Sequence, residues 1–298
     1  MTLTYIFHSG FVLETEQSIL VFDYWMDPSG VMDGVLGSKK PLYVLSSHFH
    51  EDHFTREIFE WKKRKPNITF ILSKDILRHR RANKDEADAW LAKGASWADE
   101  RISVRALGST DSGVSWIVET GGKRIFHAGD LCNWYARFLP DAVSGQTIYS
   151  EELTEQREPS SLLGWPSRDG SRRSQFAEDI DPIAHEKQYL GELKDIRKVA
   201  DSFDIVMFPI DGRTGNGYTL GGRQFIERFK VGMFVPMHFT TGFEPNEQRE
   251  QSRTCSNYAE SRERKSGAQS AWRMKEFTDE KNISFWKISR EGETIDIQ

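Results

Sequence analysis

The sequence predicts a layered α/β fold, in which short strands alternate with helices. Apolar runs of about four to eight residues, typical of buried strands, recur along most of the chain. Segments with helical spacing separate several of these runs, which favours packed layers of sheet and helix. The 298 residues are 38% hydrophobic and 12% aromatic, enough for a large core. Chains of this length and class often fold as one domain, so we expect a single domain over residues 1–298.

The expected elements form two similar halves, mostly sheet with outer helices. In the first half we expect strands at about residues 4–7, 11–14, 19–23, 43–46, 68–72, 102–106, 114–119 and 124–128, and a helix over 54–64. In the second half we expect helices at about 184–200 and 220–229, and strands at 204–209, 232–236 and 283–289.

Two segments differ in composition from the rest. Residues 136–182 are rich in Ser, Gly, Pro and charge, which reads as a long polar insertion, and residues 242–282 are charged and poor in aliphatic side chains. Loops longer than about 15 residues are uncommon inside a compact domain. A lid over a functional site and a disordered or oligomer-contacting surface are equally good interpretations of both segments.

The sequence HFHEDH, from His48 to His53, places four candidate metal ligands in one turn between an apolar run and a helical segment. Residues two apart at a strand end point the same way, so His48 and His50 can bind one cation. The turn then directs Asp52 and His53 toward a neighbouring position. The sequence therefore predicts two metal sites, in preference to a solvated turn that is merely rich in histidine.

Imidazole and carboxylate ligands suit zinc, with manganese or iron as alternatives. A site whose protein ligands fill only part of the coordination sphere leaves room for water. A metal lowers the pKa of that water to about 7 and so supplies hydroxide near neutral pH. This pattern favours a metal-dependent hydrolase.

HxHxDH after a strand resembles the signature of the metallo-β-lactamase superfamily, and the resemblance extends along most of the chain. The opening TYIFHSGFVLET, followed by SILVFDYWMDP, looks like the branch that includes L-ascorbate-6-phosphate lactonase. The resemblance implies a four-layer αβ/βα sandwich with the metals at one sheet edge. FHAGD resembles the segment that carries the bridging carboxylate, which implies Asp130, and PMHF resembles the last ligand position, which implies His238.

One position departs from the family pattern. The stretch ALGSTDSGVSW has Ser109 where the superfamily usually has a third histidine for the first site. A serine hydroxyl is a poor ligand, so water or Asp111 could complete that site. His127 is a further candidate, although its odd offset from Asp130 in a strand favours a buried or supporting histidine.

Further residues carry less specific expectations. We expect Asp52 to orient the metal-bound hydroxide and take up its proton. His8, in FHSGF, is either a donor to the substrate or leaving group or a structural histidine. Arg213, in FPIDGRTG, either pairs with a phosphate or carboxylate or forms a loop-bracing pair with Asp211. The run RHRRANK at residues 78–84 could contact an anionic substrate, but a solvated face is the simpler interpretation.

Composition limits the partners. A net charge of −5 and a pI near 6.0 argue against an extended nucleic-acid surface. The chain lacks a long apolar segment and a signal-peptide pattern, which predicts a cytoplasmic protein without a membrane span. Its two cysteines, Cys132 and Cys255, are too few and too far apart for a disulfide framework, so we expect reduced thiols.

The sequence therefore predicts a hydrolase that acts on a small anionic ester, lactone or phosphodiester. The alternatives are an inactive metal-binding regulatory or scaffold protein of the same fold and, less favoured, a nuclease of the superfamily. An oxygen-reducing di-iron protein is disfavoured because such relatives typically have glutamate where His50 stands. Analogy with the lactonase-like branch makes homo-oligomers plausible.

Overall fold

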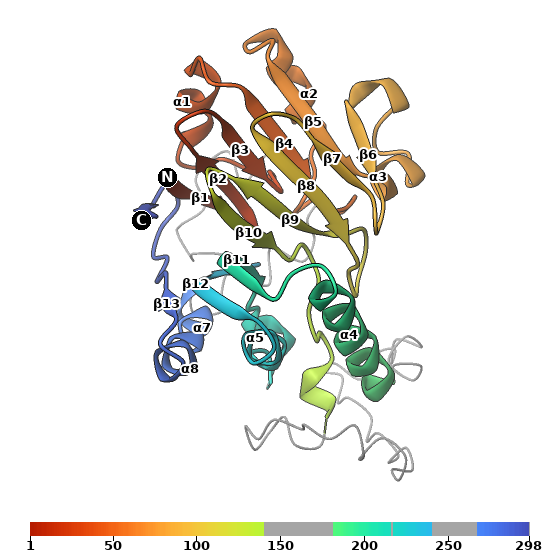
Figure 1. Ribbon diagram of the computed structural model, residues 1–298, viewed down its shortest axis with the longest axis vertical. Coiled ribbons are helices and arrows are strands. Elements are labelled where there is room, and N and C mark those ends of the chain that lie inside the picture. Colours follow the sequence, from red (N-terminus) through yellow and green to blue (C-terminus); the bar gives the residue numbers. More distant parts are fainter. Residues whose placement is uncertain (140–180, 216, 240–266, 298) are drawn as a thin grey trace, which may run out of the picture.

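The structure is a computed structural model that describes residues 1–139, 181–215, 217–239 and 267–297 (Figure 1). Within these residues two seven-stranded sheets pack against each other, and helices lie on the outer sides (Figure 1). The predicted α/β sandwich of the metallo-β-lactamase type is confirmed.

The first sheet has the strand order β14-β1-β2-β3-β4-β5-β6. Its strands are β1 (Thr2–Phe7), β2 (Gly10–Glu14), β3 (Ile19–Phe22), β4 (Leu42–Ser46), β5 (Ile68–Ser73), β6 (Ala89–Leu91) and β14 (Thr294–Asp296). Neighbours from β14 to β3 are antiparallel, whereas those from β3 to β6 are parallel.

The second sheet repeats this plan in the order β13-β12-β11-β10-β9-β8-β7. Its strands are β7 (Ser96–Ala98), β8 (Ile102–Leu107), β9 (Ser115–Thr120), β10 (Lys123–His127), β11 (Ser202–Pro209), β12 (Lys230–Met237) and β13 (Ser284–Phe285). Neighbours from β7 to β10 are antiparallel, and those from β10 to β13 are parallel. In both sheets the carboxyl ends of the parallel strands meet at one edge, where ligands are commonly bound in α/β proteins.

Short helices connect the strands. They are α1 (Val31–Gly37), α2 (Glu57–Glu60), α3 (Lys74–Arg78), α4 (Pro182–Arg197), α5 (Leu220–Ile226), α7 (Gly267–Ala271) and α8 (Met274–Glu280). Single 3-10 turns are η1 (Trp61–Lys63), η2 (Lys84–Glu86), η3 (Ala136–Phe138) and η6 (Gly212–Thr214). Asp181 caps α4 by accepting from the backbone N–H groups of Ile183 and Ala184.

The alternation of side chains along the strands produces two cores. In the first sheet Leu20 and Leu45 face the second sheet, whereas Val21 and Val44 face α1, α2 and α3. Residues of α4, α5 and α8 cover the second sheet and belong to the same core as the intersheet layer. Both faces of each central strand are therefore buried, which explains their nearly continuous apolar sequences.

Three expectations about elements need correction. The strands expected at 102–106, 114–119 and 124–128 belong to the second sheet, so the two halves divide before Ser96. The helix expected over 54–64 is only α2 and η1, because the N–H groups of His53 and Phe54 bond back to the carbonyl of His50 in the ligand loop. The last strand of the second sheet is only β13, because the N–H of Ile288 bonds to the carbonyl of Trp286 instead of continuing the ladder.

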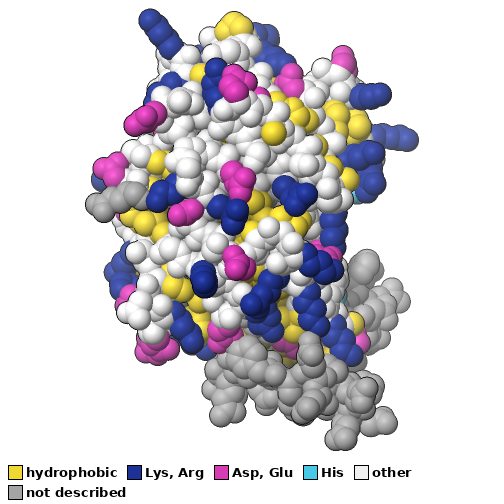
Figure 2. Space-filling view, in the orientation of Figure 1, with side chains coloured by type: hydrophobic (Ala, Val, Ile, Leu, Met, Phe, Trp, Pro, Cys, Tyr) yellow, Lys and Arg dark blue, Asp and Glu magenta, His cyan; other side chains and the backbone are white. Residues whose placement is uncertain are grey.

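The two polar segments fall mostly outside the described residues, namely at 140–180 and 240–266. In the described part of the second segment, Ala268, Ala271 and Met274 of α7 and α8 are buried in the core. In the described residues no helix is long and apolar enough to cross a membrane. Figure 2 shows side chains of both charges interspersed over the visible face.

Candidate metal centre

Loops at the strand ends bring polar side chains to the edge where the two sheets meet. His8 follows β1, Asp23 follows β3, and the HFHEDH turn follows β4. From the second sheet, Asp130 follows β10, Asp211 follows β11 and His238 follows β12. An antiparallel bridge between His8 and Phe239 joins the sheets here, and His8 O accepts from His238 N at 3.1 Å.

Asp130 lies between two groups of candidate ligands. Its Oδ2 is 3.3 Å from His48 Nε2, whereas its Oδ1 is 3.1 Å from His53 Nε2 and 3.4 Å from His238 Nε2. One carboxylate thus faces histidines on both sides. This is the position that a ligand shared by two metal ions must occupy.

The first group consists of His48, His50, Asp111 and Asp130, whose ligand atoms lie within 4.8 Å of one another. His50 Nδ1 is 3.3 Å from Asp111 Oδ2, and these two side chains are 40% and 45% exposed. Ser109 is not in the group, and its Oγ is buried without a hydrogen-bond partner in the described residues. Of the alternatives to a third histidine, the structure therefore brings Asp111 to the site.

The second group consists of His8, Asp52, His53 and His238. Asp52 Oδ2 is 3.2 Å from His8 Nε2 and 3.9 Å from the Nε2 atoms of both His53 and His238. The structure brings the four residues expected at the second site together, since Asp130 contacts this group as well. His8 is an addition, and its φ of 56° shows that the chain turns sharply to present it.

Buried atoms without hydrogen bonds test whether these residues fit a metal. His48 Nε2, His53 Nε2 and Asp130 Oδ1 are buried, and none has a hydrogen-bond partner of acceptable geometry. Leaving such atoms unsatisfied costs about 1–3 kcal/mol each. They converge on shared points where a cation would satisfy them together, so the residues fit a pair of divalent metals.

Charges in the cluster lead to the same conclusion. Burial would raise the pKa of Asp130, but His53, His238 and His48 hold it well below its usual range. Burial would lower the pKa of His53, but Asp130 and Asp52 raise it well above its usual value. The carboxylates therefore favour positive charge between them, which bound metal ions would supply.

Asp23 is a supporting residue that the sequence did not reveal. Its carboxylate is fully buried and accepts from Ser47 N at 2.7 Å and Ser47 Oγ at 2.6 Å. His53 Nδ1 lies 2.6 Å from Asp23 Oδ2, and His48 Nδ1 lies 2.9 Å from Ser47 Oγ. Asp23 thus fixes the Nδ1–H tautomers of both histidines, which turns their Nε2 lone pairs toward the metal positions. The available sequence signal was an acidic residue that ends a buried apolar strand.

His238 has a similar support. Asp211 Oδ2 lies 3.1 Å from His238 Nδ1 and also accepts from Arg213 Nη2 at 2.7 Å. Arg213 donates to both oxygens of Asp211, so the structure shows the loop-bracing pair. The Asp211 carboxylate in turn holds the histidine ring in position.

Two further residues lie outside the ligand groups. His127 is buried, its Nε2 donates to the Ser9 carbonyl at 3.0 Å, and its ring stacks on Phe22. It is therefore a buried supporting histidine, as its strand position favoured. Cys132 is a buried free thiol packed against Gly221, and burial raises its pKa.

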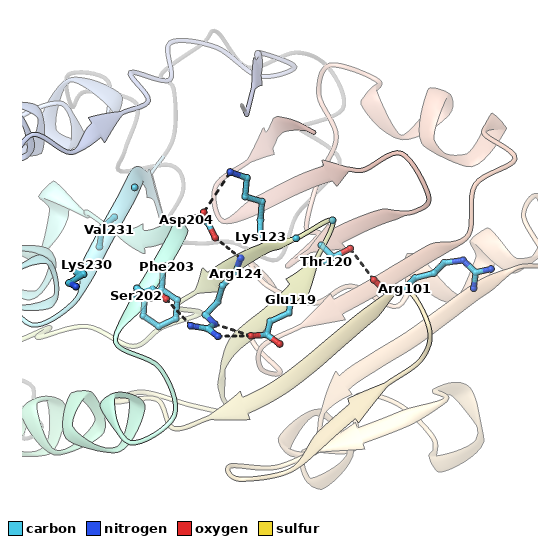
Figure 3. A pocket seen from close by; sticks show the side chains of 13 residues that line it. Arg101, Glu119, Thr120, Lys123, Arg124, Ser202, Phe203, Asp204, Lys230 and Val231 are labelled. Atoms are coloured by element: carbon cyan, nitrogen blue, oxygen red, sulfur yellow. Dashed lines mark hydrogen bonds and ion pairs between the residues drawn. The ribbon is translucent and has the colours of Figure 1, made fainter.

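A hollow of about 840 Å³ lies at the opposite end of the second sheet (Figure 3). Lys123 faces Asp204 across it at 3.7 Å, and Arg124 pairs with Glu119 at 2.8 Å. Its walls come from the starts of β10, β11 and β12, whereas the ligands follow the ends of these strands. This hollow is therefore separate from the candidate metal centre.

Comparison with known proteins agrees with this geometry. Residues 2–137 match the family model described as "Beta-lactamase superfamily domain". No curated protein matches the sequence. Among solved structures, the chain is similar to Igni18, a metallo hydrolase from Ignicoccus hospitalis, with a TM-score of 0.58 and 15% identity over 99% of this chain and 97% of that one.

Two other solved structures share the fold. A possible metal-dependent hydrolase from Veillonella parvula has a TM-score of 0.51 and 12% identity over 99% of this chain and 98% of that one. CmlA, a diiron β-hydroxylase from Streptomyces venezuelae, has a TM-score of 0.54 and 11% identity over 99% of this chain and 53% of that one. The family model thus covers the N-terminal part of the chain, residues 2–137, and these solved structures share the fold of the chain.

Proposed function

We propose that this protein is a metal-dependent hydrolase that acts on a small anionic ester, lactone or phosphodiester. The observation that carries the proposal is the position of Asp130, within 3.4 Å of histidine nitrogens from both ligand groups. In this proposal His48, His50, Asp111 and Asp130 hold one metal, and Asp52, His53, Asp130 and His238 hold the other. Two metals there would acidify a water molecule and polarise the oxygen of the bond to be cleaved.

Asp52 is the group that we propose takes up the proton of the attacking water. Burial would raise the pKa of Asp52, but the charges of His53 and His238 hold it below its usual range, so the carboxylate is ionised and can accept. Its Oδ2 lies 3.9 Å from the Nε2 atoms of His53 and His238, and from there it could reach a water shared by two metals.

His8 is proposed to position Asp52. Burial, followed by the charge of His238, lowers the pKa of His8 to about 4, so its ring is neutral at pH 7. His8 Nε2 lies 3.2 Å from Asp52 Oδ2, so the neutral ring limits the movement of that carboxylate without neutralising it. The same nitrogen is the nearest donor to a leaving group that arrives beside Asp52.

Zinc is the metal that we propose first, with iron and manganese as alternatives. The first group offers two imidazoles and two carboxylates, which suits all three metals. CmlA, which has the same fold, is described as a diiron enzyme, so iron needs equal experimental treatment.

We also propose a family branch, a domain organisation, a location and an oligomeric state. We place the chain in the lactonase-like branch on the strength of its opening segment, from which His8 reaches the second ligand group. We propose one domain over residues 1–298, a cytoplasmic location and a homo-oligomer. Sedimentation of the purified protein tests the last point.

Metal content and turnover test the proposed function. Protein purified without chelator or affinity tag should contain about two equivalents of zinc, manganese or iron per chain, as each ligand group predicts one ion. The loaded protein should hydrolyse at least one member of a panel of lactones, aryl esters and phosphodiesters, and a chelator should abolish that activity.

Asp52→Asn separates an enzyme from a metal-binding scaffold. The amide cannot take up a proton, so turnover should fall at least about 100-fold. Asp195→Asn, on the exposed face of α4, is the matched control and should retain full activity. A loaded wild type without activity on any substrate class would favour the scaffold, and the absence of metal after reconstitution would exclude both.

A further inference from the structure

A hollow of about 1170 Å³ lies beside the metal-ligand turn, between the loop after β3, α1, α2 with η1, and the turn after α3. Glu51 and Phe54, which flank Asp52 and His53, form part of its wall. Trp25 forms another part, and its ring contacts His8 with centroids 5.6 Å apart. The hollow therefore adjoins the second ligand group through Trp25 and through the turn that carries Glu51 and Phe54.

The hollow has an apolar wall and a charged rim. The apolar side chains are Trp25, Met26, Met32, Leu36, Phe54 and Trp61. On the rim, Asp33 pairs with Arg64, and Glu51 pairs with Arg81. A hollow with both apolar and charged lining beside a reactive centre is suited to a small organic molecule that carries a charge.

The other charged rim residues are also paired, with one exception. Glu57 accepts from the hydroxyl of Tyr24, Glu60 pairs with Lys63, and Asp27 accepts from the first N–H groups of α1. Arg56 binds both oxygens of Glu86. Among the residues that line the hollow, Arg80 is the one charged side chain with no hydrogen bond or ion pair to a described residue.

Arg80 is fixed relative to the metal turn from both sides. The ring of His79 stacks on Phe49, with centroids 3.8 Å apart, and Arg81 reaches Glu51 at 3.3 Å. Arg80 itself has φ of 56°, the left-handed conformation of a helix C-cap, in which the N–H groups of Arg80 and Arg81 donate to the carbonyls of Leu77 and Ile76. The helix cap therefore fixes the backbone of Arg80 at the rim, and its guanidinium has no hydrogen bond or ion pair to a described residue.

We propose that this hollow binds the non-reacting part of the substrate, an apolar group that carries one negative charge, with Arg80 as the residue that recognises the charge. A carboxylate or a phosphate ester satisfies a guanidinium through two parallel hydrogen bonds. The apolar body of the substrate lies against Trp25 and Met32, and its scissile group reaches the metals past His8. This inference rests on the proposed hydrolase function and specifies its substrate class.

Dye binding tests the hollow without requiring turnover. The probes are 8-anilinonaphthalene-1-sulfonate and N-phenyl-1-naphthylamine, which share an aromatic body, whereas only the first carries a negative charge. For the metal-loaded protein, Arg80→Gln should raise the Kd of the sulfonate about tenfold, as expected for one charge-assisted contact, and leave the Kd of the neutral dye within about twofold.

Two matched variants complete the binding test. Arg78→Gln removes a neighbouring exposed charge that does not line the hollow, and it should change neither Kd. Arg80→Lys keeps the charge without the planar fork and should recover part of the sulfonate affinity. An unchanged sulfonate Kd in Arg80→Gln, or equal losses for the two dyes, would overturn the proposal.

Turnover then links the hollow to the metal centre. The substrates are 4-nitrophenyl hexanoate and the mono-4-nitrophenyl ester of adipic acid, which have equally long acyl chains, the second ending in a carboxylate. Arg80→Gln should raise KM about tenfold for the adipate ester alone, with kcat little changed. Equal KM values for the adipate ester in wild type and variant would contradict the proposal. If wild type cleaves neither ester, the hydrolase proposal is weakened, whereas the dye comparison still decides whether the hollow recognises an anion.

Discussion

Asp23 supports His53 in the candidate metal centre through a short contact. Asp23 Oδ2 and His53 Nδ1 are 2.6 Å apart, and both side chains are fully buried. Burial would raise the pKa of Asp23, but His127 and His53 hold it below its usual range, so the carboxylate is ionised and can only accept. His53 must then carry its proton on Nδ1 and present the Nε2 lone pair to a metal.

Asp23→Asn should weaken metal binding. An amide at this position can donate to His53 Nδ1 and so favour the wrong tautomer, and it also loses one acceptor for Ser47. Loss of such a support costs about 10–100-fold in metal affinity. Competition with a coloured chelator measures this change. Asp204→Asn, at the far hollow, is the control and should bind metal like wild type; equal affinity in Asp23→Asn would contradict the supporting role.

Asp111 and Ser109 are the two candidates for the position of the missing third histidine, and replacing each residue in turn distinguishes between them. Asp111→Ala removes the carboxylate that lies 3.3 Å from His50, so the metal content should fall from about two equivalents per chain to about one. Ser109→Ala should leave it at two, because the hydroxyl is outside the ligand group. Elemental analysis after gel filtration gives the answer, and the reverse pattern would assign the site to Ser109.

A metal centre of this kind can be predicted from the sequence where one short segment contains several of its ligands. HFHEDH concentrates four candidate residues in one turn, and the structure brings them together with Asp130 and His238, which the family resemblance suggested. Asp23 has no other candidate ligand close to it in the sequence. Its supporting role arises only when β3 and β4 pair and bring its carboxylate to Ser47. The position of His8 likewise depends on its bridge to Phe239 in the other sheet, so sequence could not choose between its two interpretations.

The same reasoning explains which fold elements can be predicted from the sequence. The central strands are long, continuous apolar runs because both of their faces are buried, and all of them lie within a few residues of their expected positions. β6 and β7 have only three residues each, too few to show a period, and α1 and α3 have only seven and five residues, too few for a clear amphipathic pattern. The strands within residues 102–128 are expected in the first half but belong to the second sheet, because periodicity predicts a strand but not its neighbours.

His8 should make the stability of the metal-free protein depend on pH. Its pKa is lowered from 6.5 to about 4 in the folded state, chiefly by burial, so between these values the unfolded chain binds the proton more readily. The stability that neutral His8 contributes is therefore complete above pH 6.5 and is lost as the pH falls toward 4. The difference between the two pKa values corresponds to a free energy of unfolding of about 3 kcal/mol at most.

Urea unfolding of the metal-free wild type and of His8→Gln, at several pH values from about 4.5 to about 7.5, measures this contribution over the range that the lowered pKa defines. The advantage of wild type over the variant should shrink as the pH falls. A constant difference across the range would mean that His8 has no lowered pKa, and a growing difference would mean that it is protonated in the folded state.

Gly113 should be the glycine on which the shape of the metal turn depends most directly. It has φ of 65°, and a Cβ placed there would lie 2.1 Å from Ser47 O and 2.6 Å from His48 Cβ. Gly113→Ala must therefore push the backbone of the ligand turn away, which should destabilise the fold and reduce metal affinity. Gly122 has a similar φ of 75°, but a Cβ placed on it would meet nothing within 4 Å. Gly122→Ala therefore has the backbone strain of a positive φ but no steric clash.

The difference between the two alanine variants isolates that collision. Overpacking of this kind costs about 1–3 kcal/mol, so Gly113→Ala should unfold at lower urea concentration than Gly122→Ala by a corresponding amount. Only Gly113→Ala should also lose metal, because only its neighbour is a ligand. Equal stability and equal metal content in the two variants would show that the ligand turn moves freely, and the support that Asp23 and Ser47 give it would then be too weak to fix the histidines.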